Sequence, residues 1–273
     1  MNWVLGKASA MKIINLLFVV ILLGGNLFAQ SYRKIENIAF TRGEKLTFRV
    51  AFNSALTGSI TAGKATLEVT PENKTINNRN TYHVVGQGST SGIVELFFKI
   101  DDRFDSYFDE DAIISWQFSR RTRENRYKKD DVVNFRQKDK MAVSLSRIMK
   151  VPANIQDMLS AFYYARTLDV STMKPGDFFS IPYFLDDSVY QSKVEFAGRE
   201  TVKTKMGKFK CIVFKPMVAT GRAFDNPFPI TIWVTDDANH LPVLIESEQT
   251  VGRARIELIA HEGLLNPIEA SLR

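Results

Sequence analysis

From Glu44 onward the chain alternates apolar and polar residues with a period of two, and short turn-forming segments interrupt the alternation. In EKLTFRVAF, Leu46, Phe48 and Val50 fall on one face of an extended strand, because successive side chains of a strand point to opposite sides. Polar turn segments such as PENKTINNRN (71–80) separate one alternating run from the next. Turn signals at this spacing are typical of an antiparallel sandwich or barrel. We therefore predict an all-β, mainly antiparallel protein: a single curved sheet, or an open barrel or sandwich, with one packed α-helix.

The first 29 residues have a different character. Lys12 precedes the apolar run IINLLFVVILLGG (13–25), and a small residue, Ala29, follows shortly after it. A positive start, a short apolar core and a small residue at the cleavage point are the features of a secretory signal peptide. The run is shorter than the roughly 20 residues of a spanning helix. We predict a signal peptide at residues 1–29, cleaved near Ala29, with Met1 or Met11 as the start, and a single β domain at residues 30–273.

The charge and the single cysteine narrow the class of protein. Loss of the predicted signal peptide lowers the net charge from +6 to +4, a mildly basic value that does not require a nucleic-acid partner. Cys211 is the only cysteine, so no internal disulfide can form. Its place in the alternating KFKCIVFK predicts that it packs inward as a small hydrophobic residue. Because no cysteine directly follows the predicted cleavage point, we expect a periplasmic protein without a lipid anchor.

One segment, ANIQDMLSAFYYAR (153–166), predicts a helix at about residues 153–167. Asn154 is expected to be its N-cap, which places Asp157 in the first turn, where a negative charge is favourable. Helical periodicity then separates an apolar face from a face of small and polar residues. The apolar face would hold Ile155, Met158, Leu159, Phe162 and Ala165; the opposite face would hold Asp157, Ser160, Ala161 and Tyr164, with Arg166 half a turn further on.

This helix has two interpretations. Asp157, Ser160, Tyr164 and Arg166 could bind a ligand or partner, or they could fasten the helix to the sheet. The segment shows no arrangement of nucleophile and base, which a catalytic site requires. The sequence therefore favours the fastening role and predicts no catalytic residue.

The basic segment SRRTRENRYKK (119–129) holds six basic residues and one acid, and reads as part of a long exposed strand that turns at Lys129 to Asp131. A contiguous basic ribbon could bind lipid headgroups or an anionic glycan through residues such as Arg121 and Arg123. Alternatively, its charges could protect an edge strand from aggregation. Tyr127 is its only aromatic residue, which argues against stacking on single-stranded nucleic acid.

Sequence patterns for metal or cofactor chemistry are absent. His83, His240 and His261 are far apart and show no metal-ligand spacing. The acidic stretch DDRFDSYFDED (101–111) lacks the central glycine of a calcium-binding loop and is interpreted as a solvated strand face. No glycine-rich phosphate loop, nucleophile elbow or metalloprotease motif occurs. We predict no cofactor and no metal.

Four segments in order, GEKLTF, SAFYYAR, MGKFKC and IWVTDDANHLPV, together resemble the bacterial domain-of-unknown-function family 3108 (DUF 3108) from about Gly43 to Ile259. The resemblance implies an exported, envelope-associated protein of Gram-negative bacteria whose biochemistry is not established. It also implies an open, strongly curved antiparallel sheet closed by a helix. The periplasmic lipoprotein carriers have a similar half-barrel, which is an analogy of fold alone.

These observations favour a non-enzymatic envelope protein that binds an apolar or amphipathic ligand, or an envelope partner, in or on a curved β-sheet. Lipid, lipoprotein or anionic glycan and a peripheral membrane contact are the partners considered; the sequence does not define an oligomeric state. The alternatives are a structural or interaction protein without a ligand pocket and, third, an envelope glycan hydrolase. An apolar cavity of about 300 Å³ or more would favour the ligand-binding hypothesis. The 20 Phe residues could line such a cavity or fill an ordinary core.

Overall fold

The computed structural model describes residues 32–54, 58–217, 228–249 and 252–272. The chain from Arg33 onward forms one compact unit. The predicted signal peptide and its cleavage point at Ala29 lie outside the described residues.

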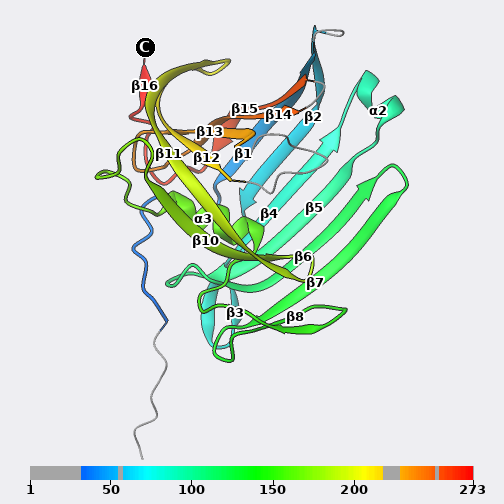
Figure 1. Ribbon diagram of the computed structural model, residues 1–273, viewed down its shortest axis with the longest axis vertical. Coiled ribbons are helices and arrows are strands. Elements are labelled where there is room, and N and C mark those ends of the chain that lie inside the picture. Colours follow the sequence, from blue (N-terminus) through cyan, green and yellow to red (C-terminus); the bar gives the residue numbers. More distant parts are fainter. Residues whose placement is uncertain (1–31, 55–57, 218–227, 250–251, 273) are drawn as a thin grey trace, which may run out of the picture. The chain divides into compact units, whose positions relative to one another are not determined.

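The described residues form one sheet of sixteen strands, and every strand pairing in it is antiparallel (Figure 1). The first nine strands are β1 (Lys45–Ser54), β2 (Gly58–Val69), β3 (Lys74–Ile76), β4 (Arg79–Thr90), β5 (Asp101–Asp109), β6 (Ser115–Glu124), β7 (Tyr127–Arg136), β8 (Met141–Val143) and β9 (Ile148–Lys150). The others are β10 (Phe178–Leu185), β11 (Ser188–Thr204), β12 (Gly207–Pro216), β13 (Ile230–Thr235), β14 (Pro242–Gln249), β15 (Gly252–Glu262) and β16 (Ser271–Leu272). The helices are α2 (Ile93–Phe97) and α3 (Met158–Arg166). The predicted fold class is confirmed, with α2 as an unpredicted second helix.

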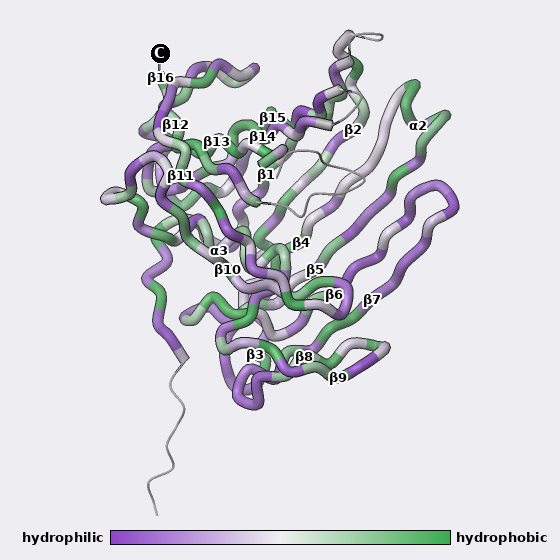
Figure 2. The backbone as a smooth tube through the Cα atoms, in the orientation of Figure 1, coloured by the Kyte–Doolittle hydropathy of each residue, from purple (hydrophilic) through white to green (hydrophobic). Residues whose placement is uncertain are grey.

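The strand order shows how the chain builds this sheet. It runs β10-β11-β12-β13-β14-β15-β1-β2-β4-β5-β6-β7-β8-β9, with β3 paired to β4 and β16 to β12. Neighbours in sequence are neighbours in space wherever a short turn joins them, as is usual for antiparallel sheets. The long-range pairing of β1 with β15 joins the two halves of the chain. Figure 2 shows hydrophobic and hydrophilic residues interspersed along the strands, the pattern that the sequence displays.

The segment before α3 links two strands that are far apart in this order. The backbone N–H of Gln156 donates to the Pro182 carbonyl on β10 at 3.1 Å, and the N–H of Phe184 donates to the Gln156 carbonyl at 2.8 Å. On the other side, the Gln137 side-chain amide donates to the carbonyls of Ser115, on β6, and Ile155 at 2.6 and 2.9 Å. The sheet is therefore curved enough for residues 155–156 to connect β10 with β6.

Helix α3 begins later than predicted. Its N-cap is Asp157, and the predicted N-cap Asn154 is wrong: Asn154 has a φ of +58°, whereas an N-cap residue is typically extended, and the non-helical Ile155 and Gln156 follow it. Ile155 and Gln156 use their backbone groups in the contacts with β6 and β10, so they are not free to form a helical turn. Asp157 and Ser160 form a reciprocal capping box.

The predicted faces of α3 are also wrong. The buried residues are Leu159, Ser160, Tyr163 and Arg166, whereas Met158 is exposed and Phe162 and Ala165 are half-buried. Tyr163 packs against Phe40 with ring centroids 4.7 Å apart, and Leu159 belongs to the same core cluster as Val84. Hydrophobicity did not identify this face, because Arg166 and Ser160 have polar partners in the interior.

A second core cluster lies between β1, β12, β14 and β15 and contains Leu46, Phe48, Phe209 and Cys211. Cys211 is buried, as predicted, and burial raises the pKa of its thiol to about 12. A thiol with this pKa is protonated at neutral pH and therefore unreactive.

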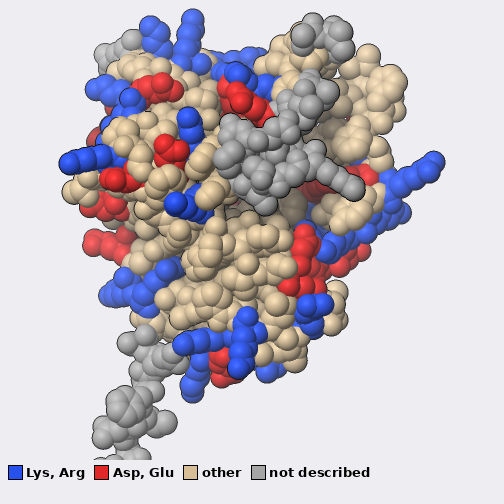
Figure 3. Space-filling model, in the orientation of Figure 1, with Lys and Arg blue, Asp and Glu red and all other residues tan. Residues whose placement is uncertain are grey.

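The basic segment forms a hairpin, not one long strand. The turn lies at Asn125–Arg126, so the predicted turn at Lys129 to Asp131 is wrong, and those residues lie within β7. Only Asn134–Arg136 of β7 pair with β8, so in the described sheet the first part of β7 pairs with β6 alone, as an edge. Figure 3 shows basic and acidic side chains interspersed on the visible face. Among the described residues, no helix has both the length and the apolar character needed to cross a bilayer.

Candidate functional site

An apolar cavity of about 410 Å³ lies between α3 and strands β10 to β13. The exposed side of α3 forms one wall, and alternate residues of β10 form another, because every second side chain of a strand faces the same way. The cavity therefore uses most of the predicted apolar face of α3, namely Met158, Phe162 and Ala165. Its lining includes Met158, Ala161, Phe162 and Ala165 from α3; Phe179, Ile181, Tyr183 and Leu185 from β10; Ser192 and Val194 from β11; Phe214 and Pro216 from β12; and Ile230, Ile232 and Val234 from β13.

Few polar side chains reach this cavity. Tyr183, Ser192, Arg166 and His240 contribute to its lining. His240 Nδ1 lies 2.8 Å from the Arg166 carbonyl oxygen. Because a carbonyl only accepts, we infer that Nδ1 carries a hydrogen and donates it to Arg166. Arg166 and His240 also line a neighbouring polar groove of about 560 Å³, so they separate an apolar space from a polar one.

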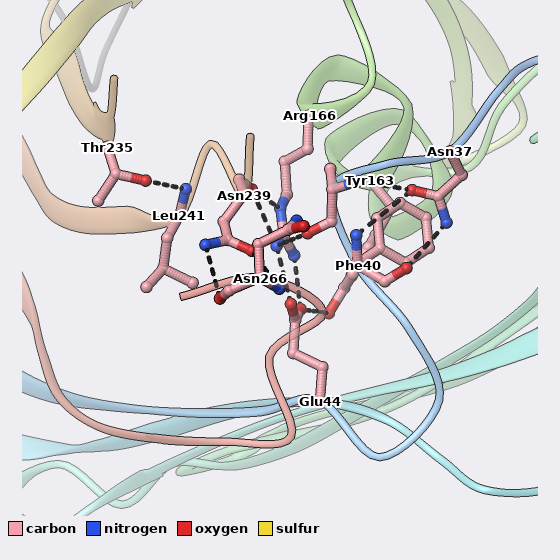
Figure 4. A network of polar contacts seen from close by, with 10 residues as sticks. Asn37, Phe40, Glu44, Tyr163, Arg166, Thr235, Asn239, Leu241 and Asn266 are labelled. Carbon is pink, nitrogen blue, oxygen red and sulfur yellow. Dashed lines mark hydrogen bonds and ion pairs between the residues drawn. The ribbon is translucent and has the colours of Figure 1, made fainter. Parts of the chain in front are cut away.

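Arg166 is held by a fully buried network (Figure 4). Its guanidinium donates to the Glu44 carboxylate at 2.5 and 2.8 Å, and to the carbonyl oxygens of Asn239 and Ala39 at 3.1 Å. The Tyr163 hydroxyl is 3.5 Å from Glu44 Oε1. Burial by itself lowers the pKa of Arg166, but the Glu44 carboxylate raises it by more, so Arg166 stays charged. The donors of Arg166 are occupied within the protein, and the residue fastens α3 to the loops before β1 and β14.

Asp157 is held in a similar way at the other end of α3. Its carboxylate accepts hydrogen bonds from the Ser106 hydroxyl at 2.6 Å, from the Ser115 hydroxyl, and from the N–H groups of Leu159 and Ser160 at 2.8 and 2.9 Å. Burial raises the pKa of this carboxyl above its usual value, and the four donors partly offset that rise. Asp157 and Ser160 are fully buried, so neither is presented to a ligand.

The remaining candidate residues lie elsewhere. The ring of Tyr164 is half-buried, with the Arg33 guanidinium 4.0 Å from its centroid. Arg121 forms an ion pair with Asp101 at 3.2 Å, and Arg123 forms one with Asp130 at 2.8 Å. The six predicted residues therefore do not form one site.

Except for Arg166, the residues that line the cavity were not predicted as binding residues from the sequence. The alternation in FFSIPYFL (178–185) predicts a strand with one apolar face, but it does not show whether that face meets a core or an empty space. His240 ends the turn that begins at Asp237, with a φ of +42°. Its position beside the cavity depends on the contact with Arg166, 74 positions away.

A separate cluster of charges surrounds His83. Its Nδ1 lies 2.8 Å from a Glu72 oxygen, its Nε2 lies 2.9 Å from an Asp105 oxygen, and its ring stacks on Tyr107 with centroids 4.2 Å apart. Arg103 donates to both oxygens of Asp105 at 2.7 and 2.8 Å. Burial raises the pKa of Asp105, but the hydrogen bonds from His83 and Arg103 outweigh it and lower the pKa from 3.8 to about 2.

This pKa predicts how acid affects stability. The pKa of Asp105 in the folded protein lies below its unfolded value of about 3.9, so the stabilisation is complete above roughly pH 4 and is lost as the pH falls towards 2. We expect the loss to be about 2 kcal/mol of unfolding free energy. Urea denaturation at several pH values should show a shallower acid decline for Asp105→Asn than for the wild type. Identical slopes in the two proteins would contradict the assignment.

Among the described residues, no group of three or more His, Cys, Asp or Glu side chains is arranged to hold a metal ion.

The fold and the cavity define the class as a curved, open antiparallel β-sheet protein that encloses a helix. It is similar to the crystal structure of a beta-barrel-like protein of the domain of unknown function DUF1849 from Brucella abortus, with a TM-score of 0.54 and 12% sequence identity over 82% of this chain and 99% of that chain. This likeness concerns the fold alone. The chain belongs to the family described as protein of unknown function DUF3108, whose model matches residues 47–259. None of the curated proteins matches the chain.

Proposed function

We propose that this protein is exported to the periplasm and binds one apolar or amphipathic ligand, such as the acyl chain of a lipid or lipoprotein, in the cavity beside α3. The observation that carries the proposal is the cavity itself. Its volume of about 410 Å³ lies within the range of small-molecule sites, about 300–1,000 Å³. Its lining is mainly aliphatic and aromatic, which suits a hydrocarbon chain.

The apolar walls of the cavity support a ligand. The cavity is partly open to solvent, so these walls meet water when it is empty. Apolar surface in water is unfavourable, and an unoccupied space deprives the walls of packing contacts. An apolar ligand removes that cost, because it restores the missing contacts.

The distribution of polar groups supports an amphipathic ligand. The most buried lining residues, such as Ile181, Val194 and Val234, are apolar. His240 and Ser192 offer hydrogen-bonding groups at the same cavity. We therefore place the polar group of the ligand beside His240 and its apolar chain against β10 and β13. The exported location is supported by the pattern at residues 1–29.

Filling the cavity tests the proposal. Ala165 lines the cavity from the half-buried side of α3. The larger side chain of Ala165→Trp should therefore fill the cavity without disturbing the buried side of the helix. We expect saturable binding of N-phenylnaphthylamine, a neutral apolar fluorophore, to the wild type, and at least tenfold weaker binding to the variant. A tenfold change corresponds to about 1.4 kcal/mol.

Tyr164→Trp is the matched control, because Tyr164 lies on the same helix and is not part of the cavity lining. It should bind the fluorophore like the wild type. Equal binding by all three proteins, at equal thermal stability, would place the fluorophore elsewhere and refute the cavity as the site. Mass spectrometry of organic extracts from the periplasmic protein would identify the natural ligand.

A further inference from the structure

Two loops lie side by side at one end of the sheet (Figure 1). One is the β4–β5 connection that carries α2, and the other is the β6–β7 turn. The Lys99 N–H donates to the Asn125 side chain at 2.8 Å, and the Asn125 N–H donates to the Lys99 carbonyl at 2.8 Å. Ile100 and Glu124 form a bridge between the two loops. We call residues 91–100 and 124–128 the tip.

The tip exposes large apolar side chains. Leu96 and Phe97 are 81% and 80% exposed, more than any other large hydrophobic residue in the described chain, and Ile93 is 63% exposed. No residue of α2 is buried. Figure 2 shows α2 as a hydrophobic segment. A contiguous apolar patch of this kind on a soluble protein marks a contact with a protein or a membrane.

The charges of the tip favour a membrane. Arg126 and Lys128 are exposed and have no acidic partner within the described residues, and Tyr127, which is 54% exposed, lies between them. Figure 3 shows basic side chains at the position of the β6–β7 turn, next to the uncharged surface of α2. Apolar side chains bordered by tyrosine and basic residues are the arrangement that interfacial membrane segments share.

The other basic residues of the basic segment (119–129) form ion pairs with aspartates. Arg121 and Arg123 pair with Asp101 and Asp130, and Arg120 and Lys129 both pair with Asp186. At the tip itself, Glu95 lies 4.0 Å from Lys99, so this pair is neutral as a whole. Glu124 is the other acid of the tip, and the two basic residues Arg126 and Lys128 outnumber it. The uncompensated charge of the tip is therefore positive.

We propose that this tip inserts into the headgroup region of an anionic lipid bilayer, with Leu96 and Phe97 in the apolar layer and Arg126 and Lys128 at the phosphates. The tip is the end of two adjacent hairpins, and such a projection reaches a bilayer without a complementary groove. The proposal goes beyond ligand binding and does not depend on the cavity.

Cosedimentation of the mature chain with vesicles tests the proposal. Vesicles of phosphatidylethanolamine with phosphatidylglycerol supply the anionic surface, and vesicles of phosphatidylcholine supply a neutral one. The wild type should bind the anionic vesicles, and less strongly at high salt. Leu96→Ser/Phe97→Ser should abolish binding. Arg126→Glu/Lys128→Glu should weaken it about tenfold or more and reduce its salt dependence, because each basic residue at the headgroups contributes a several-fold factor.

Matched variants control for surface polarity and net charge. Leu145→Ser/Ile148→Ser removes two exposed apolar side chains from the β8–β9 region. Lys208→Glu/Lys210→Glu makes the same change in net charge on β12. Both should bind like the wild type. Absence of wild-type binding, or equal binding by the tip variants, would overturn the proposal. A further result would also overturn it: the wild type forms a dimer in solution, does not bind vesicles, and becomes monomeric with Leu96→Ser/Phe97→Ser. The tip would then contact a second copy of the chain.

Discussion

The variant Arg166→Met is expected to lose about 3–5 kcal/mol of unfolding free energy, because it leaves the Glu44 carboxylate buried without its partner. Glu44 and Arg166 are both almost fully buried, so water cannot replace the lost ion pair. The carbonyl oxygens of Ala39 and Asn239 also lose their donors. Urea denaturation at neutral pH measures the change, and the slope with urea concentration should stay close to that of the wild type.

Two further variants separate this effect from a general loss of charge. Arg199 pairs with Asp236 at 3.1 Å on the surface, so Arg199→Met should cost less than about 1 kcal/mol. In Glu44→Gln/Arg166→Met the uncompensated charge is removed, and part of the lost stability should return. If Arg166→Met unfolds like the wild type but no longer binds the apolar fluorophore, Arg166 is a ligand-binding residue and the fastening role is wrong.

Asp157→Ala has the second largest expected effect, a loss of about 2–4 kcal/mol. An exposed N-cap contributes about 0.5–2 kcal/mol. Here the carboxylate also accepts from the buried hydroxyls of Ser106 and Ser115, and each buried donor left without a partner adds about 1–3 kcal/mol, although relaxation reduces the sum. Thermal and urea denaturation should agree on the direction.

Asp169→Ala is a suitable comparison for Asp157→Ala. The Asp169 carboxylate accepts from the Ser171 N–H at 2.9 Å at an exposed position, so its loss should cost less than about 1 kcal/mol. Equal effects of the two substitutions would show that the buried hydroxyls contribute nothing. An unchanged stability of Asp157→Ala, together with a lost phenotype in cells, would restore Asp157 as a binding residue.

The contacts behind these expectations show that three of the predicted binding residues on α3 have structural roles. Asp157 and Ser160 hold the first turn, and Arg166 fastens the last turn to two loops. The side of α3 that is left over, with Met158, Phe162 and Ala165, lines the cavity. Of the residues first proposed for ligand binding, Arg166 alone lines the cavity, and the ligand-binding hypothesis now depends mainly on the apolar residues around it.

The structure also changes the interpretation of the basic segment (119–129), which forms a hairpin. Its composition left open whether Arg121 and Arg123 bind an anionic surface or protect an edge strand, and both are paired with aspartates that the neighbouring strands supply. Asp101 is 20 positions from Arg121, and cross-strand register brings them together. A count of charges along the sequence includes partners only when they are local, so it overestimates the free charge of a strand.

The sequence by itself determined the β architecture, the family and the burial of Cys211. Each of these depends on local patterns: the alternation of EKLTFRVAF, the ordered set of family segments and the alternation around KFKCIVFK. Only the tertiary structure decided where α3 begins, because the backbone groups of Ile155 and Gln156 form hydrogen bonds with β6 and β10. It also decided which face of α3 is buried, because Glu44 is the partner that allows Arg166 to be buried. It also decided that β10 to β13 curve away from α3 far enough to leave a cavity, since the sheet's curvature is set by pairings between residues distant in the chain. Periodicity in the sequence predicts which face of an element a side chain lies on, and the packing of the rest of the chain determines which groups it contacts.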